Sequence, residues 1–215
     1  MDNLPKDEKQ ANRLLMLSLY VSKLSTRPAG ILMGFILIEI AETFGTTVGI
    51  AGQIVTAASL AGLIVSPFLA ALSIRYSPRN LLLAGVSFIT ISVLGCSFAF
   101  NYASMLLFYS LNGLGAAIVN PMVMTIVGEK IPEAERSRII GRVNAVTPIL
   151  STFMGLTITW IISRGWQTAF LLFVSPIIIV CFLFALVGLR RTVPSELRED
   201  DSRGYKWRIQ DDSWK

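Results

Sequence analysis

The sequence contains no histidine and few charged residues. None of its 215 residues is histidine, and Asp, Glu, Lys and Arg together make up 15%, against about a quarter in soluble domains. The absence of histidine excludes histidine proton relays, histidine metal sites, haem ligation by histidine, and Ser-His or Cys-His catalytic pairs. We therefore expect no metal, no cofactor and no enzymatic activity.

Cysteine is scarce too, and its two positions carry no chemical signal. Cys96 and Cys181 each lie inside an apolar run, without metal-ligand spacing, so we interpret them as small core residues. A cleaved signal peptide is not expected, because the apolar stretch 14–21 is followed by Lys23 and lacks a small-residue cleavage site.

Long apolar runs make up most of the chain. Hydrophobic residues account for 53% of it, and the mean hydropathy is +0.62. Crossing the hydrocarbon layer as a helix takes about 20 residues. Five runs reach that length without a charged residue, at 48–74, 81–100, 104–127, 143–163 and 167–189.

A further span is predicted near the N-terminus, and it contains two cations. The apolar pieces 14–22 and 28–38 are each too short to cross alone, but joined they form one helix of about 25 residues. This helix places Lys23 and Arg27 near mid-membrane and, because they are four residues apart, on one face. The sequence therefore predicts an all-α membrane protein with six transmembrane helices.

Basic residues are distributed unevenly around these spans. With the N-terminus in the cytoplasm, 16 of the 19 lysines and arginines lie on the cytoplasmic side and only Arg164 lies outside. The positive-inside rule then predicts that both termini are cytoplasmic. The net charge of +5 is thereby explained without a nucleic-acid partner. We expect a cytoplasmic N-terminal tail (1–12), a bundle (13–189) and a charged cytoplasmic tail (190–215).

Lys23 and Arg27 are the main candidate site residues. A cation at the centre of a bilayer costs about 3 kcal/mol on insertion scales, so it must face protein or water. No span carries an acidic residue at this depth, which favours an anionic ligand. The alternative is that Lys23 snorkels and that helix carbonyls or the asparagines of span 104–127, Asn112 and Asn120, hold Arg27.

Other residues indicate bent, closely packed helices. Five of the six spans contain proline, which removes a backbone hydrogen bond and kinks a helix. Small residues predict close packing, and polar residues predict either interhelical hydrogen bonds or cavity lining, which the sequence leaves open. These residues are Pro28, Pro67, Pro121, Pro148 and Pro176; Gly30/Gly34, Ala58/Gly62 and the Gly113–Ala117 cluster; and Gln53, Thr56, Ser59, Asn144, Thr147 and Ser151.

Several segments resemble a known family in the correct order. The run 70–79, Ala-Ala-Leu-Ser-Ile-Arg-Tyr-Ser-Pro-Arg, matches the motif G-x-x-x-D-R-x-G-R-R at Arg75 and Arg79. The segments 39–45, 112–117, 131–141 and 165–170 match other landmarks of that family, before and after this motif. Residues 13–190 are thus similar to the N-terminal six-helix half of the major facilitator superfamily of transporters.

The resemblance implies a fold of two inverted three-helix repeats and a gating role for the loop arginines Arg75, Arg79 and Arg136. Two departures matter. Tyr109 stands where proton-coupled members carry a fourth-helix arginine, and Ile74 stands where the loop motif has aspartate. Proton-driven antiport and a charged latch are therefore less expected than the resemblance alone implies.

The usual fold of that family has twelve helices, so this chain corresponds to one half. We expect a truncated or half-size form that needs a second six-helix half or a homodimer partner. The leading hypothesis is a plasma-membrane secondary transporter of a small organic solute, favoured to be anionic. It works by alternating access, with Lys23, Arg27, Asn112 and Asn120 at the solute. The alternative is a non-transporting assembly or sensor protein; a hydrolase or ion channel is disfavoured.

Overall fold

All regular structure in the described part of the chain is helical. The computed structural model describes residues 6–130, 136–145, 148, 152–153 and 165–191, and these residues contain no strand. Residues 136–145 are helical. The other helices are α1 (Lys6–Ser25), α2 (Pro28–Thr43), α3 (Val48–Arg75), α4 (Pro78–Ser97), α5 (Tyr102–Lys130), α7 (Trp166–Thr168), the π-helix η1 (Ala169–Val174) and α8 (Ser175–Arg191).

Five helical stretches within the described residues are long and apolar enough to cross a membrane. They are Met16–Thr43, Val48–Arg75, Pro78–Ser97, Tyr102–Glu129 and Trp166–Val187. They coincide with five of the six predicted spans, which confirms an all-α membrane protein. The remaining predicted span, 143–163, falls largely outside the described residues.

The first span differs from the prediction of one continuous helix. The helix stops at Ser25 and restarts at Pro28, with Thr26 and Arg27 between the two parts. Proline lacks the N–H that would bond the preceding turn. Two hydroxyls bond carbonyls just before the break: Ser25 Oγ donates to the Ser22 carbonyl at 2.7 Å and Thr26 Oγ1 to the Lys23 carbonyl at 2.8 Å.

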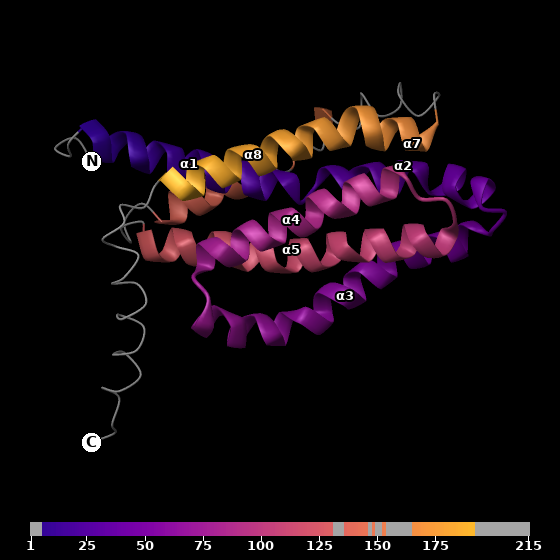
Figure 1. The fold of residues 1–215 in the computed structure, drawn as a ribbon, viewed down its shortest axis with the longest axis horizontal. Helices are drawn as coiled ribbons and strands as arrows, with labels where there is room; N and C mark the ends of the chain where they lie inside the picture. The colour runs from indigo at the N-terminus through magenta and orange to yellow at the C-terminus, as the bar shows by residue number, and fades with distance from the viewer. Residues whose placement is uncertain (1–5, 131–135, 146–147, 149–151, 154–164, 192–215) are drawn as a thin grey trace, which may run out of the picture.

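Helix α5 lies at the centre of the bundle, packed against both α3 and α4 (Figure 1). Glycines allow this close approach. A Cβ on Gly113 would overlap the backbone of Ala58 in α3, and one on Gly115 would lie 2.6 Å from the carbonyl oxygen of Gly85 in α4. The predicted packing faces at Ala58/Gly62 and at the Gly113–Ala117 cluster therefore meet each other.

The glycine pair Gly30/Gly34 does not behave as predicted. A Cβ on Gly34 would have no described atom within 4 Å, and one on Gly30 would contact only the hydroxyl of Tyr109. Both glycines are exposed. Within the described residues, this face of α2 is therefore open at Gly34 and is approached at Gly30 by the Tyr109 hydroxyl of α5.

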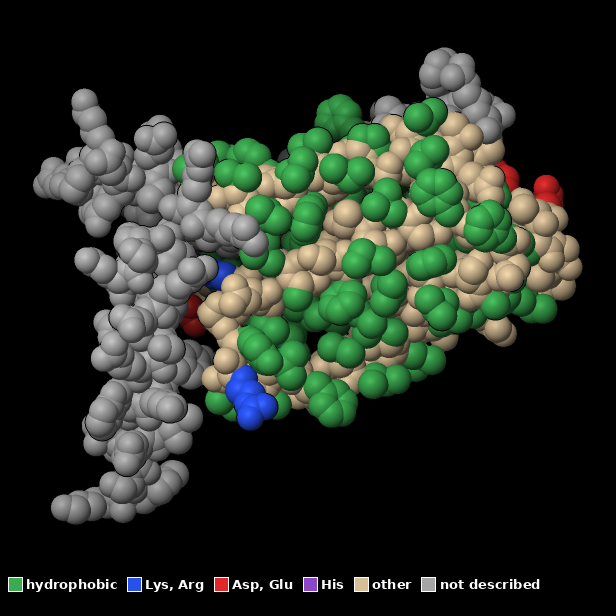
Figure 2. Space-filling view, viewed as in Figure 1, with side chains coloured by type: hydrophobic (Ala, Val, Ile, Leu, Met, Phe, Trp, Pro, Cys, Tyr) green, Lys and Arg blue, Asp and Glu red, His purple; other side chains and the backbone are tan. Residues whose placement is uncertain are grey.

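The molecular surface is apolar along the middle of the bundle. In Figure 2 hydrophobic side chains cover the long central part, while coloured basic and acidic side chains appear only at its two ends. Large residues such as Leu63, Phe68 and Leu172 are more than half exposed. Exposed apolar side chains in a band between charged ends are typical of a surface that contacts lipid.

Candidate functional site

Lys23 and Asn120 meet in the middle of the bundle although 97 positions separate them. Lys23 Nζ donates a hydrogen bond to Asn120 Oδ1 at 2.7 Å, which joins α1 to α5. The Lys23 side chain is only 8% exposed. A buried ammonium needs acceptors for its three N–H groups, and in the described residues the side-chain amide of Asn120 supplies one.

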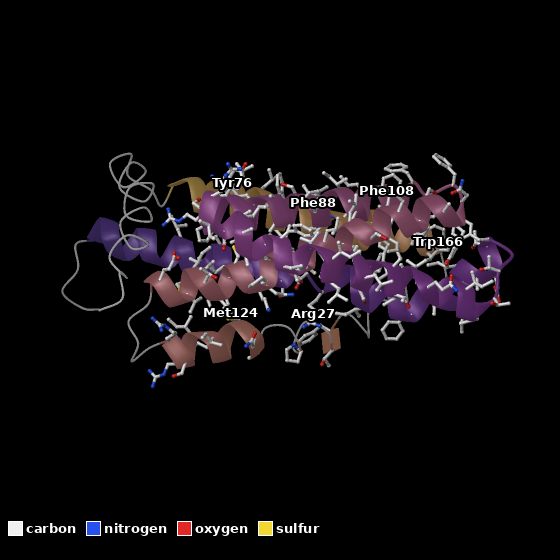
Figure 3. The ribbon with its side chains drawn as sticks, turned by 90° about the horizontal axis from the view of Figure 1, so that it is seen from below. Arg27, Tyr76, Phe88, Phe108, Met124 and Trp166 are labelled. Atoms are coloured by element: carbon white, nitrogen blue, oxygen red, sulfur yellow. The ribbon has the colours of Figure 1, made fainter. Side chains whose placement is uncertain are left out.

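Arg27 lies in the break between α1 and α2. Its own backbone N–H reaches the Leu24 carbonyl at 3.4 Å, while its side chain is exposed. Figure 3 places Arg27 near the middle of the long axis of the bundle. Within the described residues no carboxylate pairs with it, and none of its five side-chain N–H donors has a described partner.

Two further side chains of α5 lie on the N-terminal side of Asn120. Asn112 is 6% exposed, and its Nδ2 has no hydrogen-bond partner among the described residues. It precedes Asn120 by eight residues, or about 12 Å along the helix. Tyr109 is 4% exposed, and its hydroxyl lies 3.9 Å from where a Cβ of Gly30 would be.

The structure therefore brings three of the four predicted site residues to one region. It also adds Tyr109, which was not among them. Lys23, Arg27 and Asn120 lie where the α1–α2 break faces α5, Asn112 is two turns away, and Tyr109 faces the start of α2. Tyr109 was missed as a site residue because a phenol replaces the family arginine. Tyr109 is three residues before Asn112, a spacing that places both on one face of a helix, and this could have identified it from the sequence.

The side chains available here are mostly hydrogen-bond donors. Lys23 and Arg27 are cations, and the amide nitrogens of Asn112 and Asn120 also donate. No described acidic residue lies among them; Glu39 and Glu42 are near the end of α2. A donor-rich region of this kind recognises carboxylate, phosphate or sulfate oxygens better than it recognises cations.

The three loop arginines occupy different positions at the opposite end from Glu39. Arg75 ends α3 and is exposed, while Arg79 is in the first turn of α4. Arg136 Nη2 donates to the Gly128 carbonyl at 2.6 Å. The last carbonyls of a helix lack intrahelical partners, so Arg136 caps the end of α5, whereas Arg75 and Arg79 remain at the α3–α4 turn.

A second contact between distant segments was not predicted. Trp166 Nε1 donates to Thr43 Oγ1 at 3.1 Å, and the Trp166 ring contacts Phe44 and Phe170 at centroid distances of 5.9 and 6.5 Å. Figure 3 shows Trp166 at the end of the bundle away from Tyr76. This cluster ties the end of α2 to α7 and η1.

The remaining polar candidates are distributed differently. Gln53, Thr56 and Ser59 are all exposed on α3, and Asn144 is exposed on the helix 136–145. The hydroxyl of Ser59 donates to its own helix, at the Val55 carbonyl. Thr147 and Ser151 lie outside the described residues.

Sequence comparison assigns the chain to a family of known fold and activity. A family model described as the Major Facilitator Superfamily matches residues 24–210. The chain is 24% identical over 190 residues to the multidrug transporter protein MdtP of Bacillus subtilis, covering 87% of this chain and 35% of MdtP. It is also 24% identical over 154 residues to the uncharacterized MFS-type transporter YwfA of the same organism, covering 68% of this chain and 37% of YwfA.

A plant protein is similar as well. The chain is 28% identical over 120 residues to the probable sphingolipid transporter spinster homolog 1 of Arabidopsis thaliana, covering 54% of this chain and 24% of that protein. The matched region thus spans between 24% and 37% of the length of these three relatives.

Proposed function

The chain belongs to the major facilitator superfamily, and on that premise we propose that its bundle carries a small organic anion across the membrane by alternating access. Membership of the family and the apolar helices make it a multi-pass membrane protein of transmembrane transport. The proposal adds the solute class, the residues that contact it and the transport cycle.

The arrangement of side chains at the α1–α2 break is the observation that supports an anionic solute. Arg27 is exposed and its side-chain donors have no described partner, Lys23 is buried beside it, and the Nδ2 of buried Asn112 has no described partner either. A buried amide without a partner costs free energy unless a ligand or water satisfies it. We infer that Arg27 makes the first contact with the anion.

The Lys23–Asn120 hydrogen bond supports a second role in the same site. Asn120 holds the ammonium of Lys23 between α1 and α5, so its charge stays fixed near Arg27. Two cations four residues apart repel each other, and an anion between them relieves that repulsion. The free energy of binding thereby favours a solute that carries at least one full negative charge.

Transport further requires a second six-helix bundle. Alternating access in this fold moves two bundles around a central site, and the chain spans at most 37% of the relatives named above. We propose that the face of α2 at Gly34, where a Cβ would meet no described atom within 4 Å, borders the pathway between the bundles. The partner bundle is another copy or a different six-helix unit.

Both termini of the chain are proposed to face the cytoplasm, with the bundle in the plasma membrane. Arg75, Arg79 and Arg136 mark one end of the described helices, while Glu39 and Glu42 are near the other. The positive-inside rule places the arginine-rich end in the cytoplasm. The three-helix repeats and a gating role for these arginines remain part of the same proposal.

The experiment is flux of radiolabelled organic anions and cations, compared in membrane vesicles that contain the protein. Arg27→Gln should lower anion flux about tenfold, because a charge-assisted hydrogen bond contributes about 1.5–3 kcal/mol, while Arg27→Lys should keep part of it. Arg138→Gln, which removes an exposed arginine outside the site, is the control.

Unchanged anion flux in both Arg27→Gln and Lys23→Met would contradict the site assignment. A preference for cations in the wild type would contradict the solute class. Saturable anion binding without any flux, in vesicles that contain the partner bundle, would favour a sensor over a transporter.

A further inference from the structure

A groove of about 390 Å³ separates α3 from α5 toward the end at which α4 begins. The two helices are in contact at Gly62, where a Cβ would lie 3.0 Å from the Gly113 carbonyl oxygen. Beyond that contact they diverge (Figure 1), and the groove lies between residues 66–73 of α3 and 117–122 of α5. Each helix carries a proline there, Pro67 and Pro121, and proline bends helices.

The walls of this groove offer an occupant mainly apolar contacts. Its two serine hydroxyls, Ser66 and Ser73, donate to carbonyls of their own helix at 2.9 and 2.7 Å, so they present no free donor to an occupant. Exposed Leu63 and Ile74 flank the groove on α3, at 68% and 61% exposure. A volume in the range of roughly 300–1,000 Å³ is typical of small-ligand sites, and these walls suit a hydrocarbon chain.

Positive charge lies just beyond the end of the groove at which α3 and α5 diverge. Arg75 is two residues past Ser73 and ends α3. Arg79 is in the first turn of α4, six residues before Gly85, which approaches Val119 of α5. At about 1.5 Å per residue, Arg79 is about 9 Å nearer this end than Gly85.

Glu129 is a described acidic residue at the same end, near the end of α5. The first turn of α4 contains no acidic residue, and its N-cap Ser77 makes no side-chain capping bond. No described carboxylate forms an ion pair with Arg75 or Arg79. Basic pockets beside transmembrane helices at the cytoplasmic surface bind anionic lipid headgroups, and the N-terminus of a helix adds to the attraction for phosphate.

We propose that this groove binds one acyl chain of an anionic phospholipid, with its phosphate at Arg79 and Arg75. This lipid site is separate from the anion site at Arg27 and does not rest on the transported solute. The small lining residues, such as Ser66, Ala70 and Ala117, would also admit a helix of a second bundle. The positive charge of Arg75 and Arg79 favours an anionic lipid instead. A bound lipid would fill the space between α3 and α5 and hold the α3–α4 turn at the membrane surface.

Native mass spectrometry of the purified full chain tests this proposal, using phosphatidylglycerol and phosphatidylcholine with identical acyl chains as probes. Wild type should retain phosphatidylglycerol in preference to phosphatidylcholine. Arg79→Gln and Arg75→Gln should each weaken retention of phosphatidylglycerol about five-fold, the effect of one arginine near an anionic surface. Arg138→Gln removes an equal charge from an exposed position outside the groove and should leave retention unchanged.

A pair of tryptophan variants tests the groove itself. Ala70→Trp fills the groove and should lower retention of both lipids, whereas Ala71→Trp adds the same bulk at the next, exposed position outside the lining and should not. Equal retention by these two variants, or no preference for phosphatidylglycerol in wild type, would overturn the proposal. So would an Ala70→Trp variant that loses a protein partner while it keeps its lipid.

Discussion

At the residue scale, Lys23 is the side chain whose environment most constrains the account. It is buried, it carries charge in an otherwise apolar span, and its described partner is a neutral amide 97 positions away. The sequence identified both residues separately, because a cation and an asparagine in apolar runs are conspicuous. It could not pair them, because their contact depends on how α1 crosses α5.

Removal of Asn120 should destabilise the protein through Lys23. In Asn120→Ala the buried ammonium loses its acceptor, which should lower the free energy of unfolding by about 1–3 kcal/mol. Thermal unfolding of the purified protein in detergent measures this change. Asn144→Ala, at an exposed position, should stay within about 0.5 kcal/mol of wild type.

A second substitution separates the lost bond from lost packing. Lys23→Met in the Asn120→Ala background removes the unpartnered cation and should recover part of the stability. If the double variant is as unstable as the sum of the two single variants, the hydrogen bond is not what holds these helices together.

Tyr109 and Trp166 show which residue-scale features escape sequence reasoning. Each was recognised only as a position in a family motif. Their burial and contacts, Tyr109 beside Gly30 and Trp166 bonded to Thr43, arise from segments far apart in the chain. Periodicity finds the faces of one helix, but it does not say which face of another helix lies against them.

At the scale of elements, the close approach of α3 and α5 depends on Gly113. Gly113→Ala would drive a methyl group into the backbone of Ala58, and backbone cannot move aside as a flexible side chain does. Overpacking of this kind costs about 1–3 kcal/mol, which should appear as a lower melting temperature in detergent.

Gly128→Ala in the same helix is the matched control. A Cβ there would meet no atom within 4 Å, and alanine is the better helix former by about 1 kcal/mol. We expect this variant to be unchanged or slightly more stable. Equal effects of the two variants on the melting temperature would contradict a specific role for the contact between Gly113 and α3.

The link between α2 and α7 should be measurable by the same method. Trp166→Phe keeps an aromatic ring against Phe44 and Phe170 but removes the N–H that donates to Thr43. The loss should be about 0.5–1.5 kcal/mol, the net contribution of one hydrogen bond. Thr43→Val added to Trp166→Phe should cost little more, and a fully additive double variant would contradict the bond.

Sequence reasoning located the helices better than their interruptions. Length and the absence of charge were sufficient for α3, α4 and α5, because a membrane span needs about 20 apolar residues. The break at Thr26 and Arg27 was read as a continuous helix, although Pro28 marked it. Proline allows either a kink or a new helix start, and hydroxyl bonds to the freed carbonyls decide for the latter.

At the scale of the whole molecule, the orientation follows from charge and is testable with cysteine labelling. The two native cysteines are buried, so an impermeant maleimide should label few background sites. Asn101→Cys, in the exposed α4–α5 turn, should react in intact cells, whereas Asn80→Cys, exposed at the start of α4, should react only after permeabilisation. The reverse pattern would invert the proposed topology.

The proposal for the whole molecule combines family membership with two further parts, the solute class and the second bundle. The sequence and the fold support these parts less directly than they support family membership. Family membership assigns the chain to a superfamily of membrane transporters, and this much the motifs had indicated. The solute class rests instead on a few donors near one helix break, and the second bundle rests on how alternating access works. These two parts need separate measurements, and binding comes before flux.

The most direct test of the central claim is ligand-induced thermal stabilisation of the purified protein, measured with a panel of organic anions and matched organic cations. A ligand that binds only the folded state raises stability by about 2.7 kcal/mol at one hundred times its Kd. The account predicts that at least one anion raises the melting temperature of wild type and of Arg138→Gln, but not that of Arg27→Gln. Stabilisation by cations, or an anion effect that persists in Arg27→Gln, would contradict it.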